Sequence, residues 1–122
     1  MMMALNTFLV SLGAATGSVS RYGVGKLFER VTKSRFPWGT WVINLTGTLL
    51  IGIFFRDLES VRQDREWWML LGTGFCGGYT TFSTMSVEAR RLFRSGSWLI
   101  AVLYLVSSLG LGILIAYLTQ WI

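Results

Sequence analysis

The stretch GFCGGYTTFSTM, residues 74–85, combines apolar side chains with residues that interrupt helices. Three glycines, Gly74, Gly77 and Gly78, precede a run of hydroxyl-bearing residues. A glycine in a helix costs about 1 kcal/mol relative to alanine, and Ser and Thr hydroxyls compete for backbone carbonyls. The stretch therefore predicts a break in a helix between Gly77 and Thr80. At membrane depth, backbone groups freed by a break are tolerated only when buried in protein or lining a cavity.

The composition around this stretch is that of a membrane protein. The chain has 122 residues, of which 52% are hydrophobic and only 14% are charged, whereas about 25% are charged in ordinary soluble domains. The length suits one compact unit. We therefore expect a single all-α membrane domain over residues 1–122, lying in a lipid bilayer.

The residue types that are missing exclude several functions. There is one cysteine, Cys76, and no histidine, which rules out an intrachain disulfide, a His/Cys zinc site and catalysis by Ser-His-Asp or Cys-His groups. We therefore expect no enzyme. The net charge is +5, but Lys and Arg between membrane spans serve to set orientation and to meet anionic lipid. Nucleic acid is not an expected partner.

Four apolar stretches approach the length of about 20 residues that crosses a bilayer. They cover residues 5–20, 38–55, 67–89 and 98–118, and the opening stretch lies in the third. Small residues such as Gly13 and Gly17 let helices approach closely in lipid. The pattern predicts four transmembrane helices, with a break in the third, that assemble into an oligomer.

Two of the apolar stretches carry an aligned polar face. Thr40 and Asn44 are four residues apart, as are Tyr104 and Ser108, so each pair shares one side of a helix. A mid-membrane asparagine usually faces the bundle interior or a water-filled path. Asn44 could alternatively serve only as an interhelical hydrogen bond, but the two aligned faces favour a polar pathway. Unwound carbonyls at the break could bind a small cation, and the ring edge of Phe82 could face an anion.

These residues resemble the CrcB/Fluc family of small fluoride channels. The resemblance rests on GFCGGYTTFSTM, on GTWVINLTGTLLIG at residues 39–52 and on the Arg21-Tyr22 pair. It implies an antiparallel homodimer of inverted subunits with two fluoride pores and one sodium ion at the two-fold axis. It also implies a multi-pass protein of the bacterial inner (plasma) membrane that exports cytoplasmic fluoride.

The resemblance further implies roles for individual residues. The backbone carbonyls of Gly77 and Thr80 would hold the sodium ion, and Arg21 would have a structural role at the end of the first span. Met85 stands where the family has a second phenylalanine beside Phe82, so this aromatic box is half present. The implied fluoride pathway comprises Thr40, Asn44, Phe82, Ser83, Thr84, Met85, Tyr104 and Ser108.

The loop charges conflict with dual insertion. Eight Lys and Arg residues lie in or beside the first and third loops, against three in the second loop. The positive-inside rule then favours one orientation, with both tails outside. A homodimer of inverted copies remains the expectation, and a heterodimer with an oppositely oriented paralogue is the alternative.

Two other functions fit a small membrane protein. A proton-coupled multidrug exporter needs a membrane-embedded carboxylate in its first span, but residues 1–28 contain no Asp or Glu and only Glu88 lies within a span. A non-transporting assembly protein would leave the aligned polar faces unexplained. The fluoride channel is therefore the favoured hypothesis.

Overall fold

The computed structural model describes residues 2–59 and 65–121, and all regular structure in these two segments is helical. The first half runs through α1 (Met2–Val31), α2 (Trp38–Phe54) and a π-helical turn, η1 (Phe55–Glu59). The second half comprises α3 (Arg65–Trp67), the π-helix η3 (Trp68–Cys76), α4 (Gly77–Tyr79), α5 (Phe82–Arg94) and α6 (Trp98–Thr119).

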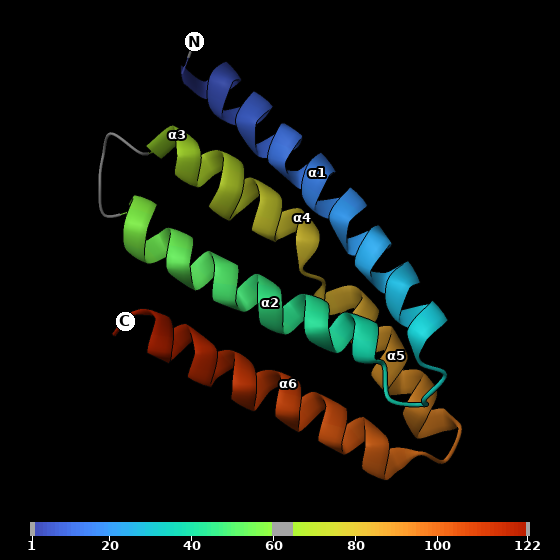
Figure 1. Cartoon of the computed structure of the whole chain (residues 1–122). Coiled ribbons are helices and arrows are strands. Elements are labelled where there is room, and N and C mark those ends of the chain that lie inside the picture. Colours follow the sequence, from blue (N-terminus) through green and yellow to red (C-terminus); the bar gives the residue numbers. More distant parts are fainter. Residues whose placement is uncertain (1, 60–64, 122) are drawn as a thin grey trace.

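The helices lie side by side in a bundle (Figure 1). α1 packs against η3 and α4, while α2 contacts α1, η3 and α6. α5 packs mainly against α6. The third apolar stretch therefore changes neighbours along its length: its first part contacts α1 and its last part contacts α6.

Among the residues that the structure describes, three helices have the length and apolar composition to cross a membrane: Met2–Val31, Trp38–Leu58 and Trp98–Thr119. Many of their large apolar side chains point outward. In α6, for example, Val106 and Ile113 are 64% and 71% exposed. The chain is an all-α membrane protein, as its composition predicts. The third apolar stretch, residues 67–89, is divided among α3, η3, α4 and α5.

α1 extends beyond the end that the sequence predicts. The first apolar stretch ends at residue 20, but the helix continues to Val31 through a charged segment. Within this segment, Lys26 Nζ lies 3.3 Å from a carboxylate oxygen of Glu29, and such pairs support a water-facing helix. The helix therefore runs on for ten residues beyond Arg21, which ends the apolar stretch. Hydrophobicity marks where the apolar stretch ends, not where the helix ends.

The helix interruption near residue 80 also differs in detail from the expectation. Gly77 and Gly78 are helical, and the extended residues are Thr80 (φ −79°, ψ 156°) and Thr81 (φ −149°, ψ 121°). A methyl group at Gly78 would overlap the carbonyl oxygen of Ala14 in α1. Gly78 therefore serves close packing, and the extended residues, Thr80 and Thr81, begin at the C-terminal end of the predicted range.

We predict that Gly17→Ala destabilises the fold by about 1–3 kcal/mol, because the added methyl group would overlap the Phe75 carbonyl and push α1 away from η3. Gly23→Ala in the same helix is the matched control, since it would meet nothing within 4 Å. Thermal unfolding of the two purified variants in detergent checks the prediction. Equal midpoints would show that the contact between α1 and η3 can relax without cost.

Candidate functional site

The side chain of Asn44 is paired with the backbone of Thr81. Asn44 Nδ2 donates to the Thr81 carbonyl at 3.0 Å, and the Thr81 N–H donates to Asn44 Oδ1 at 2.9 Å. Both bonds cross from α2 to the extended residues between α4 and α5. An amide is well suited to this role, because it offers one acceptor to the Thr81 N–H, which has no helical acceptor, and one donor to the Thr81 carbonyl.

The Thr81 hydroxyl starts the next helix. Its Oγ1 accepts from the Thr84 N–H at 3.1 Å, which caps α5, and donates to Thr84 Oγ1 at 3.1 Å. Ser83 Oγ lies 3.3 Å from the same hydroxyl. Ser and Thr are preferred at helix N-termini for this reason. Three hydroxyls, those of Thr81, Ser83 and Thr84, thus gather at the first turn of α5.

Two backbone carbonyls lose their usual helical donors at this point. In a continuous helix, Gly77 O would accept from the Thr81 N–H and Thr80 O from the Thr84 N–H. Here Thr81 donates to Asn44, and Thr84 donates to the Thr81 side chain. The described residues contain no cluster of three or more His, Cys, Asp or Glu side chains that could hold a metal ion. Neutral carbonyl oxygens such as these two are the ligands that a small hard cation can use.

A first groove, of about 650 Å³, opens on one side of Thr81. The sequence-predicted residues Arg21, Thr40, Ser83 and Thr84 line it. Thr40 Oγ1 donates to Glu88 Oε1 at 2.5 Å. Lys26, Arg91 and Glu29 also border this groove, so both signs of charge are present on its walls.

A second groove, of about 410 Å³, is also bordered by Thr81. Asn44, Phe82, Met85 and Ser108 line it together with apolar residues of α2 and α6. Phe82 is 74% exposed, whereas Met85 is 6% exposed. Phe82, the one phenylalanine of the expected aromatic box that this chain has, is therefore exposed at the second groove. Met85, which stands in the place of the second phenylalanine, is packed in the core beside it.

Two hydroxyls of α6 are buried next to this groove without a partner in the part of the chain that the structure describes. They are Tyr104 Oη and Ser108 Oγ, which lie one helical turn apart. Tyr104 is 0% and Ser108 8% exposed. A buried hydroxyl without a hydrogen bond costs about 1–3 kcal/mol, so these two positions favour a polar partner such as a water molecule or an ion.

Thr81 borders both grooves. Of the predicted pathway residues, three lie on the first groove, four on the second, and Tyr104 is buried beside them. Arg21 borders the first groove from within α1 rather than from its end. Glu88 was not selected as a site residue from the sequence. The sequence did contain a sign of its role, because Glu88 is the only acidic residue within the four apolar stretches. In the structure, its hydrogen bond to Thr40 places it at the first groove.

Comparisons with known proteins identify the family of this chain. The family model described as "CrcB-like protein, Camphor Resistance (CrcB)" matches residues 8–120. The chain is 41% identical over 118 residues to the fluoride-specific ion channel FluC 2 of Clostridium acetobutylicum, covering 97% of each chain.

Two further relatives carry similar names. The fluoride-specific ion channel FluC of Acidobacterium capsulatum is 45% identical over 111 residues, covering 89% of this chain and 88% of the relative. FluC 1 of Listeria monocytogenes is 40% identical over 116 residues, covering 95% of each chain. Because the family model spans nearly the whole chain and these relatives match over most of their length, the chain belongs to the CrcB family.

Proposed function

We propose that the chain is a fluoride-selective ion channel, rather than an enzyme, and that it exports cytoplasmic fluoride across the bacterial inner membrane. One observation supports this most: Thr81, whose backbone is fixed by Asn44, borders two grooves whose walls carry hydroxyls and, in the second groove, the Phe82 side chain. The names of the relatives indicate the ion.

In this proposal fluoride passes along neutral hydrogen-bond donors. Ser83 and Thr84 stand on the first groove and Ser108 on the second, and the buried Tyr104 hydroxyl extends the line. Hydroxyls can replace part of the hydration shell of an anion, while a carboxylate facing it would repel it. The exposed edge of Phe82 carries partial positive charge and adds an attractive contact.

The functional unit is proposed to be an inverted dimer with two pores. In each subunit α3, η3, α4 and α5 together form the third of four membrane crossings. Gly77 supports a second subunit, because it is exposed and a methyl group there would meet nothing within 4 Å of this chain. The glycine thus has no packing role inside one subunit. The second subunit is either a second copy or an oppositely oriented relative.

A structural sodium ion at the dimer axis fits the carbonyls of Gly77 and Thr80. Both have lost their helical donors to Asn44 and Thr81, so two such oxygens from each subunit would give a neutral hard-oxygen site. When bound, the ion would supply a fixed positive charge between the two pores and satisfy carbonyls that lipid cannot.

The proposal is tested by measuring fluoride efflux from liposomes that contain the purified protein, with chloride as the competing anion. Rapid efflux of fluoride without chloride is expected. Equal passage of both anions, or of neither, would contradict the proposed function.

We predict that Asn44→Ala and Asn44→Asp each lower fluoride flux by about tenfold or more. Alanine leaves the Thr81 N–H unpaired, at a cost of about 1–3 kcal/mol, and each 1.4 kcal/mol is about tenfold in a rate. Aspartate cannot donate to the Thr81 carbonyl and would repel the anion. Efflux assays on cross-linked dimers check this outcome.

Thr46→Val is the control for that experiment. Thr46 lies on α2 near Asn44 and bonds to Val42 O and Tyr79 Oη, but borders neither groove. Its flux should match the original protein. Normal flux in both Asn44 variants would remove Asn44 from the pathway.

Met85→Phe is predicted to preserve or raise fluoride flux without admitting chloride. The new ring would stand where Met85 borders the second groove and would offer a second positive edge beside Phe82. Leu109→Phe, on the same groove, controls for added bulk and should not raise the flux. Loss of flux in a folded Met85→Phe protein would show that the ring overpacks the core around Ala89 and Tyr104.

Gly77→Val is predicted to disrupt dimerisation and to abolish the stabilisation of the protein by sodium. The branched side chain would stand where the second subunit approaches, although it meets nothing within its own chain. Cross-linking yield, and the melting temperature in sodium against an organic cation, provide the readouts. Cys76→Ala, at the buried neighbouring position, should be mild. A Gly77→Val protein that still dimerises and responds to sodium would remove this residue from the axis.

A further inference from the structure

α6 runs parallel to α2, so that both helices begin at one end of the bundle and finish at the other (Figure 1). Among the described residues, side-chain hydrogen bonds join α6 to α2 and its flanking residues at three levels, between partners 62 to 68 positions apart. At the first level, Arg35 Nη1 donates at 3.0 Å to the hydroxyl of Ser97, the residue that precedes α6. α6 is therefore attached at its beginning.

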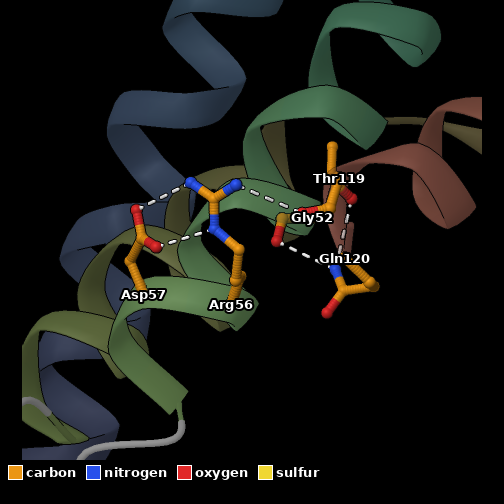
Figure 2. Close-up of polar contacts among 5 residues, drawn as sticks. All are labelled: Gly52, Arg56, Asp57, Thr119 and Gln120. Atoms are coloured by element: carbon orange, nitrogen blue, oxygen red, sulfur yellow. Dashed lines mark hydrogen bonds and ion pairs between the residues drawn. The ribbon is translucent and has the colours of Figure 1, made fainter. Parts of the chain in front are cut away.

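The last level joins the C-terminal ends of the two helices. Figure 2 shows Arg56 donating to the Thr119 carbonyl at 3.3 Å, and Gln120 Nε2 donating to the Gly52 carbonyl at 3.2 Å. A methyl group at Gly52 would overlap the Thr119 side chain, so the helices approach closely here. Both ends of α6 are thus attached, and the rotation of its middle is set by the contacts between them.

The middle level is a chain of two hydrogen bonds. Trp41 Nε1 donates to Ser107 Oγ at 3.0 Å, and the Ser107 hydroxyl donates to the Tyr104 carbonyl at 3.3 Å. The ring of Phe36 stands edge-on to the rings of Trp41 and Tyr104, at centroid distances of 6.1 and 5.5 Å. Phe36 and Trp41 also pack against the core that contains Tyr104. The indole of Trp41 therefore fixes α6 at the turn that begins with Tyr104.

This turn carries the two buried hydroxyls that have no partner among the described residues, Tyr104 Oη and Ser108 Oγ. Because no hydrogen bond to the described residues holds these hydroxyls, their direction depends on the rotation of the α6 backbone. Successive residues of a helix point about 100° apart, so a bond that fixes Ser107 also fixes the direction of Ser108. Tyr104 is fixed at the same time through its carbonyl.

We propose that Trp41 and Ser107 are positioning residues of the fluoride pathway, an inference that rests on the proposed function. Their hydrogen bond sets the rotation of α6 at which the hydroxyls of Tyr104 and Ser108 face the passing anion. Neither Trp41 nor Ser107 lines either groove, so the pair acts through the two hydroxyls. Loss of the bond leaves both ends of α6 attached to α2, and the helix stays in the bundle with its middle turn free to rotate.

Fluoride efflux from liposomes tests the pair. Trp41→Phe and Ser107→Ala should each lower the efflux rate about two- to tenfold, the range that one hydrogen bond controls, while chloride stays excluded. The two changes together should lower it no further, since both remove the same bond. Ser107→Thr keeps the hydroxyl and should retain the original rate. Original efflux rates in Trp41→Phe and Ser107→Ala would overturn the proposal.

Ser95→Ala is the matched control for the loss of a serine hydroxyl. Ser95 Oγ donates to the Leu92 carbonyl, three residues earlier, at 3.1 Å, as Ser107 does to Tyr104, but Ser95 lies outside α6 and lines neither groove. Its efflux rate should match that of the original protein.

A background without the two hydroxyls separates positioning from general support of the bundle. In a Tyr104→Phe, Ser108→Ala protein, Trp41→Phe should cause no further loss of fluoride efflux, because the groups through which it acts are gone. A further loss as large as in the original protein would show that Trp41 only supports the fold, and would overturn the proposal.

Thiol labelling gives a readout that does not depend on transport. Ser108→Cys is made in a Cys76→Ala background, and the purified protein is treated in detergent with a small methanethiosulfonate. Residue 108 is 8% exposed at the second groove, so labelling should be slow, and Trp41→Phe should speed it severalfold by freeing the turn. Met3→Cys, at an exposed position, should react at one rate with or without Trp41→Phe.

The two readouts distinguish the possible failures. An unchanged labelling rate at residue 108 in Trp41→Phe would overturn the positioning role, whatever the efflux. If the original protein moves no fluoride but Trp41→Phe speeds the labelling, the proposed function fails, and the control of α6 rotation by Trp41 and Ser107 stands.

Discussion

The pairing between the Asn44 amide and the Thr81 peptide group is the interaction on which the rest of this structure depends. Without it, the Thr81 N–H would be left unpaired in an apolar bundle, at a cost of about 1–3 kcal/mol. With it, the chain can remain extended at Thr80 and Thr81 between two helices. A single side chain of α2, that of Asn44, therefore stabilises a non-helical segment inside the helix bundle.

α2 contributes a second feature to the same end. Gly47 lies one turn from Asn44, and a methyl group there would overlap the Thr80 side chain. The helix thus supplies space for Thr80 and hydrogen bonds for Thr81. Because the interruption redirects the chain, α5 can leave α1 and place Met85 and Ala89 in a core with Tyr104 of α6. The two grooves that Thr81 borders follow from this change of direction.

The sequence predicted the class of the protein better than the boundaries of its helices. Membrane class and helical content could be inferred from the composition, and a partner for Asn44 could be expected, because a polar residue in an apolar stretch demands one; the structure supplies it in Thr81. The extent of α1 could not, since the segment after residue 20 is held by water-facing pairs such as Lys26 with Glu29 rather than by an apolar pattern. The bond between Thr40 and Glu88 joins residues 48 positions apart, and no local pattern records such a distance.

The glycines show which surfaces a single chain leaves unexplained. At Gly13, Gly17 and Gly78 a methyl group would overlap backbone atoms of a neighbouring helix, so packing within the chain accounts for them. At Gly77 and Gly110 it would meet nothing within 4 Å. Glycine destabilises a helix interior by about 1 kcal/mol relative to alanine. Where no atom of the same chain lies close to the glycine, packing within the chain does not explain why alanine is absent. Close approach by a second chain in lipid supplies one. α4 and the middle of α6 are then the parts of the surface where the contacts of a second subunit should be sought, and α6 is also the helix that carries the unpartnered hydroxyls of the site.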